Sequence, residues 1–127
     1  KVIETKFLAL TKINEKTFFV GSNGKLIEVK KNLKSLPYIF GKIDIKNFLS
    51  FKKIIDESNL DFQEIKNLYF FPSGRWDIET LSETLIRLPN TKLKDKLDLS
   101  LKILDSEKFR NIKLIDLRQK NQVITNE

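Results

Sequence analysis

The chain of 127 residues contains neither cysteine nor histidine. Without these residues it has no disulfide, no thiolate redox centre, no typical zinc site and no Ser-His or Cys-His nucleophile. We therefore predict a protein that is not an enzyme and that carries no cofactor and no metal. The absence of cysteine does not identify the compartment, because a chain without thiols tolerates either redox environment.

Glycine is also scarce, and long apolar segments are missing. The four glycines, Gly21, Gly24, Gly41 and Gly74, do not form a Walker-type or dinucleotide-binding loop, and turns explain all of them. No uninterrupted apolar run exceeds four residues, whereas roughly 20 are needed to span a bilayer. The chain begins at Lys1 without a methionine, so we expect a fragment that a signal or membrane segment could precede.

The residues that are present indicate one globular domain with a basic surface. Hydrophobic residues make up 40% of the chain, which is enough for a core at this length. The net charge is +7, but only four of the 24 basic residues are arginine, at positions 75, 87, 110 and 118. Nucleic-acid readers favour arginine forks and aromatic stacking platforms. A solvated, lysine-coated surface therefore explains the charge better than nucleic-acid binding.

Hydrophobic periodicity predicts three strands, a helix, three strands, a second helix and two strands. The dipeptide Asn23-Gly24 marks a hairpin, and a helix from Asp44 or Asn47 places Phe48, Phe51 and Ile55 on one face. The predicted strands are 7–10, 17–20, 25–29, 62–71, 75–81, 84–88, 112–118 and 122–125, and an extended segment covers 36–41.

Segment 92–105 fits two periodicities, because its leucines recur at helical spacing while residues 97–103 also alternate as in a strand. The length of the segment and the cap candidates Asn90 and Thr91 favour a helix. The predicted fold class is therefore α+β, a mixed α/β arrangement. It consists of a mostly antiparallel β-sheet with two helices packed on one face and an exposed C-terminal edge strand.

Paired carboxylates are the only candidates for acid-base chemistry. Asp56 and Glu57 lie on the polar side of the first predicted helix. Asp77 and Glu79 share one face of a strand, opposite Trp76 and Ile78, which we expect in the core. No cleft is indicated around either pair, so solvated surface charges explain them better than a hydrolase site.

The C-terminal ribbon has more functional potential. Residues 112–118 form a good strand, and the polar segment 119–125 follows it. If this segment is the outermost strand, one row of its backbone N–H and C=O groups is unpaired, and a partner can satisfy them by adding a strand. A protected edge without a partner is the alternative, and the residues alone do not decide between the two.

Several segments, taken in order, resemble a known family. They are Val2–Leu10, the hairpin that ends at Gly24-Lys25-Leu26-Ile27, the segment Leu36-Pro37-Tyr38-Ile39-Phe40-Gly41, the segment Arg75-Trp76-Asp77-Ile78 followed by Leu85–Pro89, and Ile115-Asp116-Leu117-Arg118. They resemble the extracytoplasmic β domain of the bacterial cell-division family FtsQ, called DivIB in other lineages. The resemblance covers essentially the whole chain.

The resemblance implies a location and a domain organisation. Residues 1–6 would be the exit strand of a preceding POTRA domain, and residues 7–127 would be the FtsQ-type β domain. The full-length protein would cross the inner membrane once, and this domain would lie in the periplasm at the division septum.

The resemblance also implies a partner and a binding site. The domain would be a non-catalytic divisome scaffold that binds the FtsB–FtsL pair by strand addition and so helps regulate septal peptidoglycan synthesis. Arg118 would pair with an acidic residue of the partner, and Arg75 is a second candidate cation. The edge-strand residues expected to bind are Gln119, Lys120, Asn121, Gln122, Val123, Ile124 and Thr125.

Three alternatives stay open. One is a basic nucleic-acid-binding module, which the net charge motivates. Another is a hydrolase built on the paired carboxylates. The third is a POTRA-linked domain of outer-membrane protein assembly, because such proteins also handle β-strands.

Overall fold

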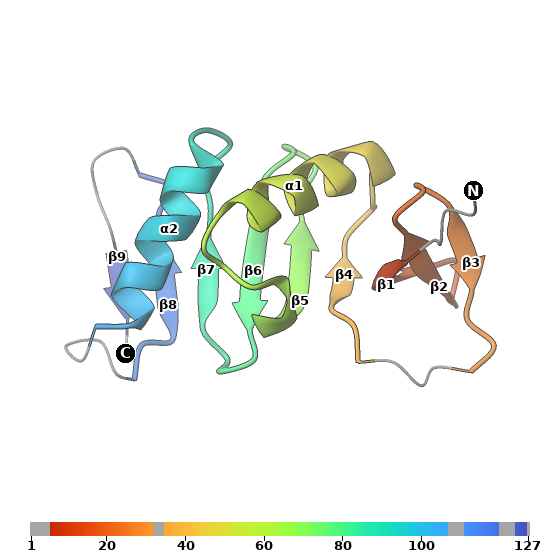
Figure 1. Ribbon diagram of the computed structural model, residues 1–127, viewed down its shortest axis with the longest axis horizontal. Coiled ribbons are helices and arrows are strands. Elements are labelled where there is room, and N and C mark those ends of the chain that lie inside the picture. Colours follow the sequence, from red (N-terminus) through yellow and green to blue (C-terminus); the bar gives the residue numbers. More distant parts are fainter. Residues whose placement is uncertain (1–5, 32–34, 107–110, 120–123, 127) are drawn as a thin grey trace.

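The computed structural model describes residues 6–31, 35–106, 111–119 and 124–126. These residues form one nine-stranded sheet, two α-helices and a short 3-10 helix, η1 (Figure 1). The helices are α1 (Ile45–Glu57) and α2 (Leu93–Leu104), and η1 is Phe62–Glu64. The strands are β1 (Phe7–Ile13), β2 (Lys16–Gly21), β3 (Leu26–Glu28), β4 (Tyr38–Phe40), β5 (Ile65–Phe70), β6 (Trp76–Thr80), β7 (Leu85–Arg87), β8 (Leu114–Asp116) and β9 (Ile124–Asn126).

The strand order is β3-β2-β1-β4-β5-β6-β7-β8-β9. The pairings β1–β4, β4–β5 and β7–β8 are parallel, and the other five are antiparallel. Parallel neighbours need a crossover connection, and α1 and α2 provide those between β4 and β5 and between β7 and β8. Both helices lie on the same side of the sheet (Figure 1). The predicted fold class, including a C-terminal strand at the edge, is confirmed.

Most of the predicted elements are present, with three differences. Segment 36–41 contributes β4, which inserts between β1 and β5 and is parallel to both. Residues 62–64 form η1 instead of the start of a strand. Segment 92–105 is helical as predicted, but its N-cap is Lys92, with φ 53°, and no side chain caps it. The prediction that Asn90 or Thr91 caps this helix is therefore wrong.

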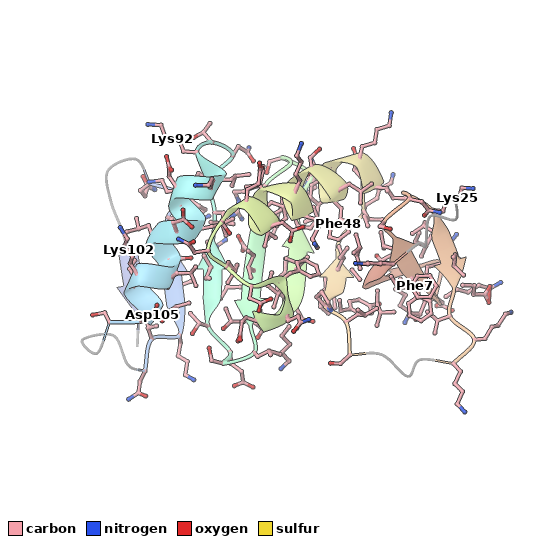
Figure 2. All side chains as sticks on the ribbon, in the orientation of Figure 1. Phe7, Lys25, Phe48, Lys92, Lys102 and Asp105 are labelled. Carbon is pink, nitrogen blue, oxygen red and sulfur yellow. The ribbon has the colours of Figure 1, made fainter. Side chains whose placement is uncertain are left out.

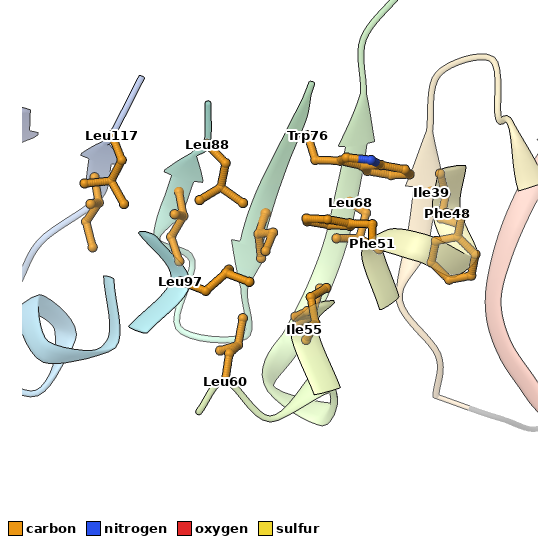
Figure 3. Close-up of a cluster of buried hydrophobic side chains, with 14 of the residues drawn as sticks. Ile39, Phe48, Phe51, Ile55, Leu60, Leu68, Trp76, Leu88, Leu97 and Leu117 are labelled. Atoms are coloured by element: carbon orange, nitrogen blue, oxygen red, sulfur yellow. The ribbon is translucent and has the colours of Figure 1, made fainter. Parts of the chain in front are cut away.

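The core lies between the helices and the sheet (Figure 3). The predicted face of α1, Phe48, Phe51 and Ile55, is buried. Trp76 is only 2% exposed, and its ring stacks on Phe51 with centroids 4.8 Å apart. Its indole N–H donates a hydrogen bond of 2.8 Å to Asn47 Oδ1. The prediction that Trp76 is a core residue is confirmed.

The exterior carries most of the lysines. Figure 2 shows the side chains of Lys25, Lys92 and Lys102 pointing away from the ribbon, whereas Phe48 lies between α1 and the sheet. Among the described residues, no helix combines the length and the apolar character that a membrane span requires.

The alternation of side chains along β6 separates the two faces of the sheet. Trp76 and Ile78 point toward the helices and are buried, so Asp77 and Glu79 belong to the helix-free face. In the register of the sheet, Asp77 lies opposite Arg87 on β7, and Arg87 lies opposite Asp116 on β8. A row of charged residues therefore crosses three strands toward the C-terminal edge.

Candidate partner-binding edge

Strand β9 forms the C-terminal edge of the sheet. It pairs antiparallel with β8, so that Thr125 lies opposite Ile115 and Ile124 opposite Asp116. Within the described part of the chain, no strand lies on its other side. In an antiparallel pair, successive residues direct their N–H and C=O groups to opposite sides. Half of the backbone groups of β9 therefore point away from the sheet and are available to an added strand.

Five charged residues, in a row that runs from β6 to β8 toward this edge, form what we call the charge ladder. They alternate in sign across β6, β7 and β8 and the residues flanking them, on the helix-free face. The members of the charge ladder are Arg75, Asp77, Arg87, Asp116 and Arg118.

Asp77 is the more deeply buried acid of the ladder. Its side chain is 4% exposed, and it forms ion pairs with Arg75 Nη1 and, at 3.3 Å, with Arg87 Nε. The Arg75 guanidinium also lies 4.4 Å from the ring centre of Phe71 and donates a 3.3 Å hydrogen bond to the Leu88 carbonyl. The prediction that Asp77 is a solvated surface charge is wrong, because two arginine side chains cover it.

Asp116 is bound by the arginine that follows it two residues later. Arg118 Nε and Nη2 donate hydrogen bonds of 2.9 and 2.7 Å to Asp116 Oδ1 and Oδ2, and its backbone N–H donates one of 3.1 Å to Oδ1. These bonds lower the pKa of Asp116, mainly through the guanidinium, and raise the pKa of Arg118. Arg118, which the resemblance pairs with an acidic residue of the partner, is therefore already paired within the domain.

Arg87 is the arginine of the charge ladder that has a buried donor without a hydrogen bond. Its Nε is buried and has no hydrogen-bond partner, because the N–H is not aligned with Asp77 although the two groups are close. The sequence alone does not single out Arg87 as a site residue. A β6–β7 hairpin would have placed Arg87 opposite Asp77. Predicting that pairing, however, requires the type of the turn at residues 81–84, which sets the register.

Glu79, the other carboxylate of the β6 pair, accepts hydrogen bonds from two neutral side chains. Glu79 Oε1 accepts hydrogen bonds from Asn67 Nδ2 at 2.7 Å and from Tyr69 Oη at 3.0 Å. The bond from Asn67 makes the largest contribution to lowering the pKa of Glu79, while burial raises the pKa of Tyr69. Of two surface cavities among the described residues, one is lined by Asp56 of the other carboxylate pair, and neither is lined by Asp77 or Glu79. Asp77 and Glu79 therefore do not lie in either of these cavities.

Comparison with known proteins decides the family. The family model described as "Cell division protein FtsQ/DivIB, C-terminal" matches residues 9–118. The chain belongs to the FtsQ/DivIB family. The resemblance predicted from the sequence is thus confirmed, and it implies a scaffold role in cell division through binding to other division proteins. The match includes the whole charge ladder and ends before β9.

A solved structure has the same fold as this FtsQ/DivIB domain. It is the major extracytoplasmic domain of the trans isomer of the bacterial cell-division protein DivIB from Geobacillus stearothermophilus. The TM-score is 0.59 at 17% sequence identity, and the match covers 88% of this chain and 100% of the other. No curated protein sequence matches the chain.

The predicted site residues of this FtsQ/DivIB domain fall into four groups. Arg75 and Arg118 lie in the charge ladder, and Ile124 and Thr125 lie in β9. Gln119 is exposed in the bend after β8. The other four predicted residues, Lys120, Asn121, Gln122 and Val123, lie outside the described residues.

Proposed function

We propose that this domain is a non-catalytic divisome scaffold that binds the FtsB–FtsL pair by β-strand addition along β9. Through this contact it helps regulate septal peptidoglycan synthesis. It works as the periplasmic domain of a single-pass inner-membrane protein at the septum, with residues 1–6 leading in from a POTRA domain and residues 7–127 forming the binding domain.

The observation that carries the proposal is the position of β9. A strand of a cell-division scaffold lies at the end of the sheet with pairing on one side only. Backbone hydrogen bonds to its free side would hold an extended partner segment whatever its side chains, so affinity would come from the edge itself. Selectivity then needs a side chain close to the added strand.

Arg118 meets that requirement. It follows β8, the neighbour of β9, and its side chain is 37% exposed. Adjacent strands are about 4.8 Å apart, so an added strand runs roughly 10 Å from β8, within the combined reach of an arginine and a glutamate. A paired guanidinium and carboxylate would contribute roughly 1.5–3 kcal/mol if the interface excludes water, and less than about 1 kcal/mol if it stays exposed.

Mutation of Arg118 to Glu together with Val123 to Pro tests the proposal. We expect this variant to lose capture of the FtsB–FtsL pair in a pull-down, because it reverses the selecting charge and removes a backbone donor from the terminal segment. The matched control is Lys30→Glu, a charge reversal of an 86% exposed side chain next to β3, at the other end of the sheet. Unchanged capture by the double variant would end the strand-addition proposal.

A further inference from the structure

We propose that Arg87 is a reserve cation for Asp116. When a carboxylate of the partner pairs with Arg118, the Arg87 side chain reorients toward Asp116. The Asp116 carboxylate then stays ion-paired in the complex. This inference rests on the proposed function, because it concerns the exchange of Arg118 between two carboxylates. Arg87 acts through Asp116 and Arg118, and it is therefore a positioning residue.

The need for a reserve cation follows from the pairing of Arg118. In the free domain its guanidinium is occupied by Asp116, with two hydrogen bonds of 2.7 and 2.9 Å. A partner acid must displace these bonds. The Asp116 side chain is only 9% exposed, and a buried carboxylate left without a partner is strongly destabilising. Without a second cation, this loss would offset most of the gain from the new ion pair.

Arg87 is placed to provide that second cation. It lies directly opposite Asp116 in the parallel pairing of β7 with β8. Adjacent strands are about 4.8 Å apart, which is shorter than an extended arginine side chain. Rotation about side-chain torsions therefore brings its guanidinium to Asp116 without movement of the backbone.

Arg87 also has donors to spare. A guanidinium has five N–H donors, yet the buried Nε of Arg87 has no hydrogen-bond partner. Its other neighbour, Asp77, is already bound by Arg75 Nη1. Arg87 can thus move away from Asp77 without leaving the Asp77 carboxylate unpaired. The ladder holds three arginines and two aspartates, so one guanidinium is in excess until a partner acid arrives.

A double-mutant cycle on partner affinity tests the proposal, with the FtsB–FtsL pair as the probe. Arg87→Gln should weaken binding roughly tenfold or more, because the complex then contains an unpaired buried carboxylate. In an Asp116→Asn background the same change should have little further effect, since no carboxylate then needs the reserve cation. Arg87→Lys should restore most of the affinity, because it returns the positive charge.

A second measurement separates this role from a structural one. The pKa of Asp116 is followed by NMR of its side-chain carboxyl in the bound state. In the wild-type complex we expect the pKa to stay below its ordinary value, with Arg87 in place of Arg118. In the Arg87→Gln complex the pKa should rise above its ordinary value, because burial then acts on a carboxylate without a neighbouring cation. Arg87 already lowers the pKa of Asp116 slightly in the free domain, so a role in folding alone would give the same rise on Arg87→Gln in the free and the bound state.

Two results overturn the inference. One is wild-type affinity of Arg87→Gln, and the other is a loss of the same size in both backgrounds. If Arg118→Gln weakens binding while Arg87→Gln does not, only the reserve role of Arg87 is wrong. If Arg118→Gln also binds like the wild type, the exchange of Arg118 does not occur, and the charge-selection part of the proposed function fails with it.

Discussion

Replacement of Trp76 by Ala is expected to lower the free energy of unfolding by about 3–5 kcal/mol, the range for loss of a large buried aromatic side chain. Trp76 is 2% exposed and stacks on Phe51 from α1, with an angle of 4° between the rings. Its ring centre also lies 6.2 Å from that of Phe48 and 4.7 Å from that of Phe70. The substitution removes the ring contacts with Phe48 and Phe51 by which Trp76 packs β6 against α1.

Urea unfolding followed by far-UV circular dichroism measures this effect, because the substitution removes the only tryptophan and with it the fluorescence signal. Trp76→Phe is the matched control. It keeps a ring against Phe51 but loses the hydrogen bond to Asn47, so a loss of roughly 1–2 kcal/mol is expected. An unfolding midpoint of the Ala variant equal to that of the wild type would contradict the assignment of Trp76 to the core.

The second large effect concerns Asp77. Its replacement by Ala should lower the free energy of unfolding by on the order of 3 kcal/mol, because it leaves Arg75 and Arg87 without their shared carboxylate. The side chains of Asp77, Arg75 and Arg87 are 4%, 15% and 31% exposed, so solvent screens the pairs only in part.

Glu79→Gln is the control for Asp77→Ala. It changes the next acid on the same face of β6 but keeps an oxygen that can accept the bonds from Asn67 and Tyr69. We expect a change below about 1 kcal/mol. Similar losses in the two variants, measured by the same unfolding experiment, would mean that Asp77 has no special role in the charge ladder.

The sequence predicts the local elements of this fold well because their signals are local. Phe48, Phe51 and Ile55 recur at helical spacing, and they form the buried face of α1. Asn23-Gly24 predicts the hairpin of β2 and β3, in which Gly24 adopts φ 81°. These features depend on residues a few positions apart, so a single sequence contains the information.

The long-range parallel pairings are harder to predict. Strand β4 has only three residues, and it gains its place by pairing with β1 and β5, whose paired residues lie 28 and 29 positions away in the sequence. Thr11 on β1 is buried next to β4, and its hydroxyl donates a hydrogen bond to the Ile39 carbonyl. Nothing in the residues of segment 36–41 specifies these neighbours.

The sequence predicts only part of the candidate site, because the rest also depends on long-range pairing. The edge strand follows from the order of elements, and Arg118 from the family resemblance. The pairing of Arg118 with Asp116, and the free donor of Arg87, depend on the register of three strands. Such a register fixes which charges meet across a sheet, and alternation within one strand does not reveal it.

Amide hydrogen exchange in β9 tests the central proposal most directly. In the free domain, the amides of Ile124–Asn126 that face away from β8 should exchange fast, and their neighbours that face β8 slowly. With the FtsB–FtsL pair at about 100 times its Kd, the fast amides should slow roughly 100-fold. Binding of the pair while those amides continue to exchange at the rate of the free domain would contradict strand addition at β9.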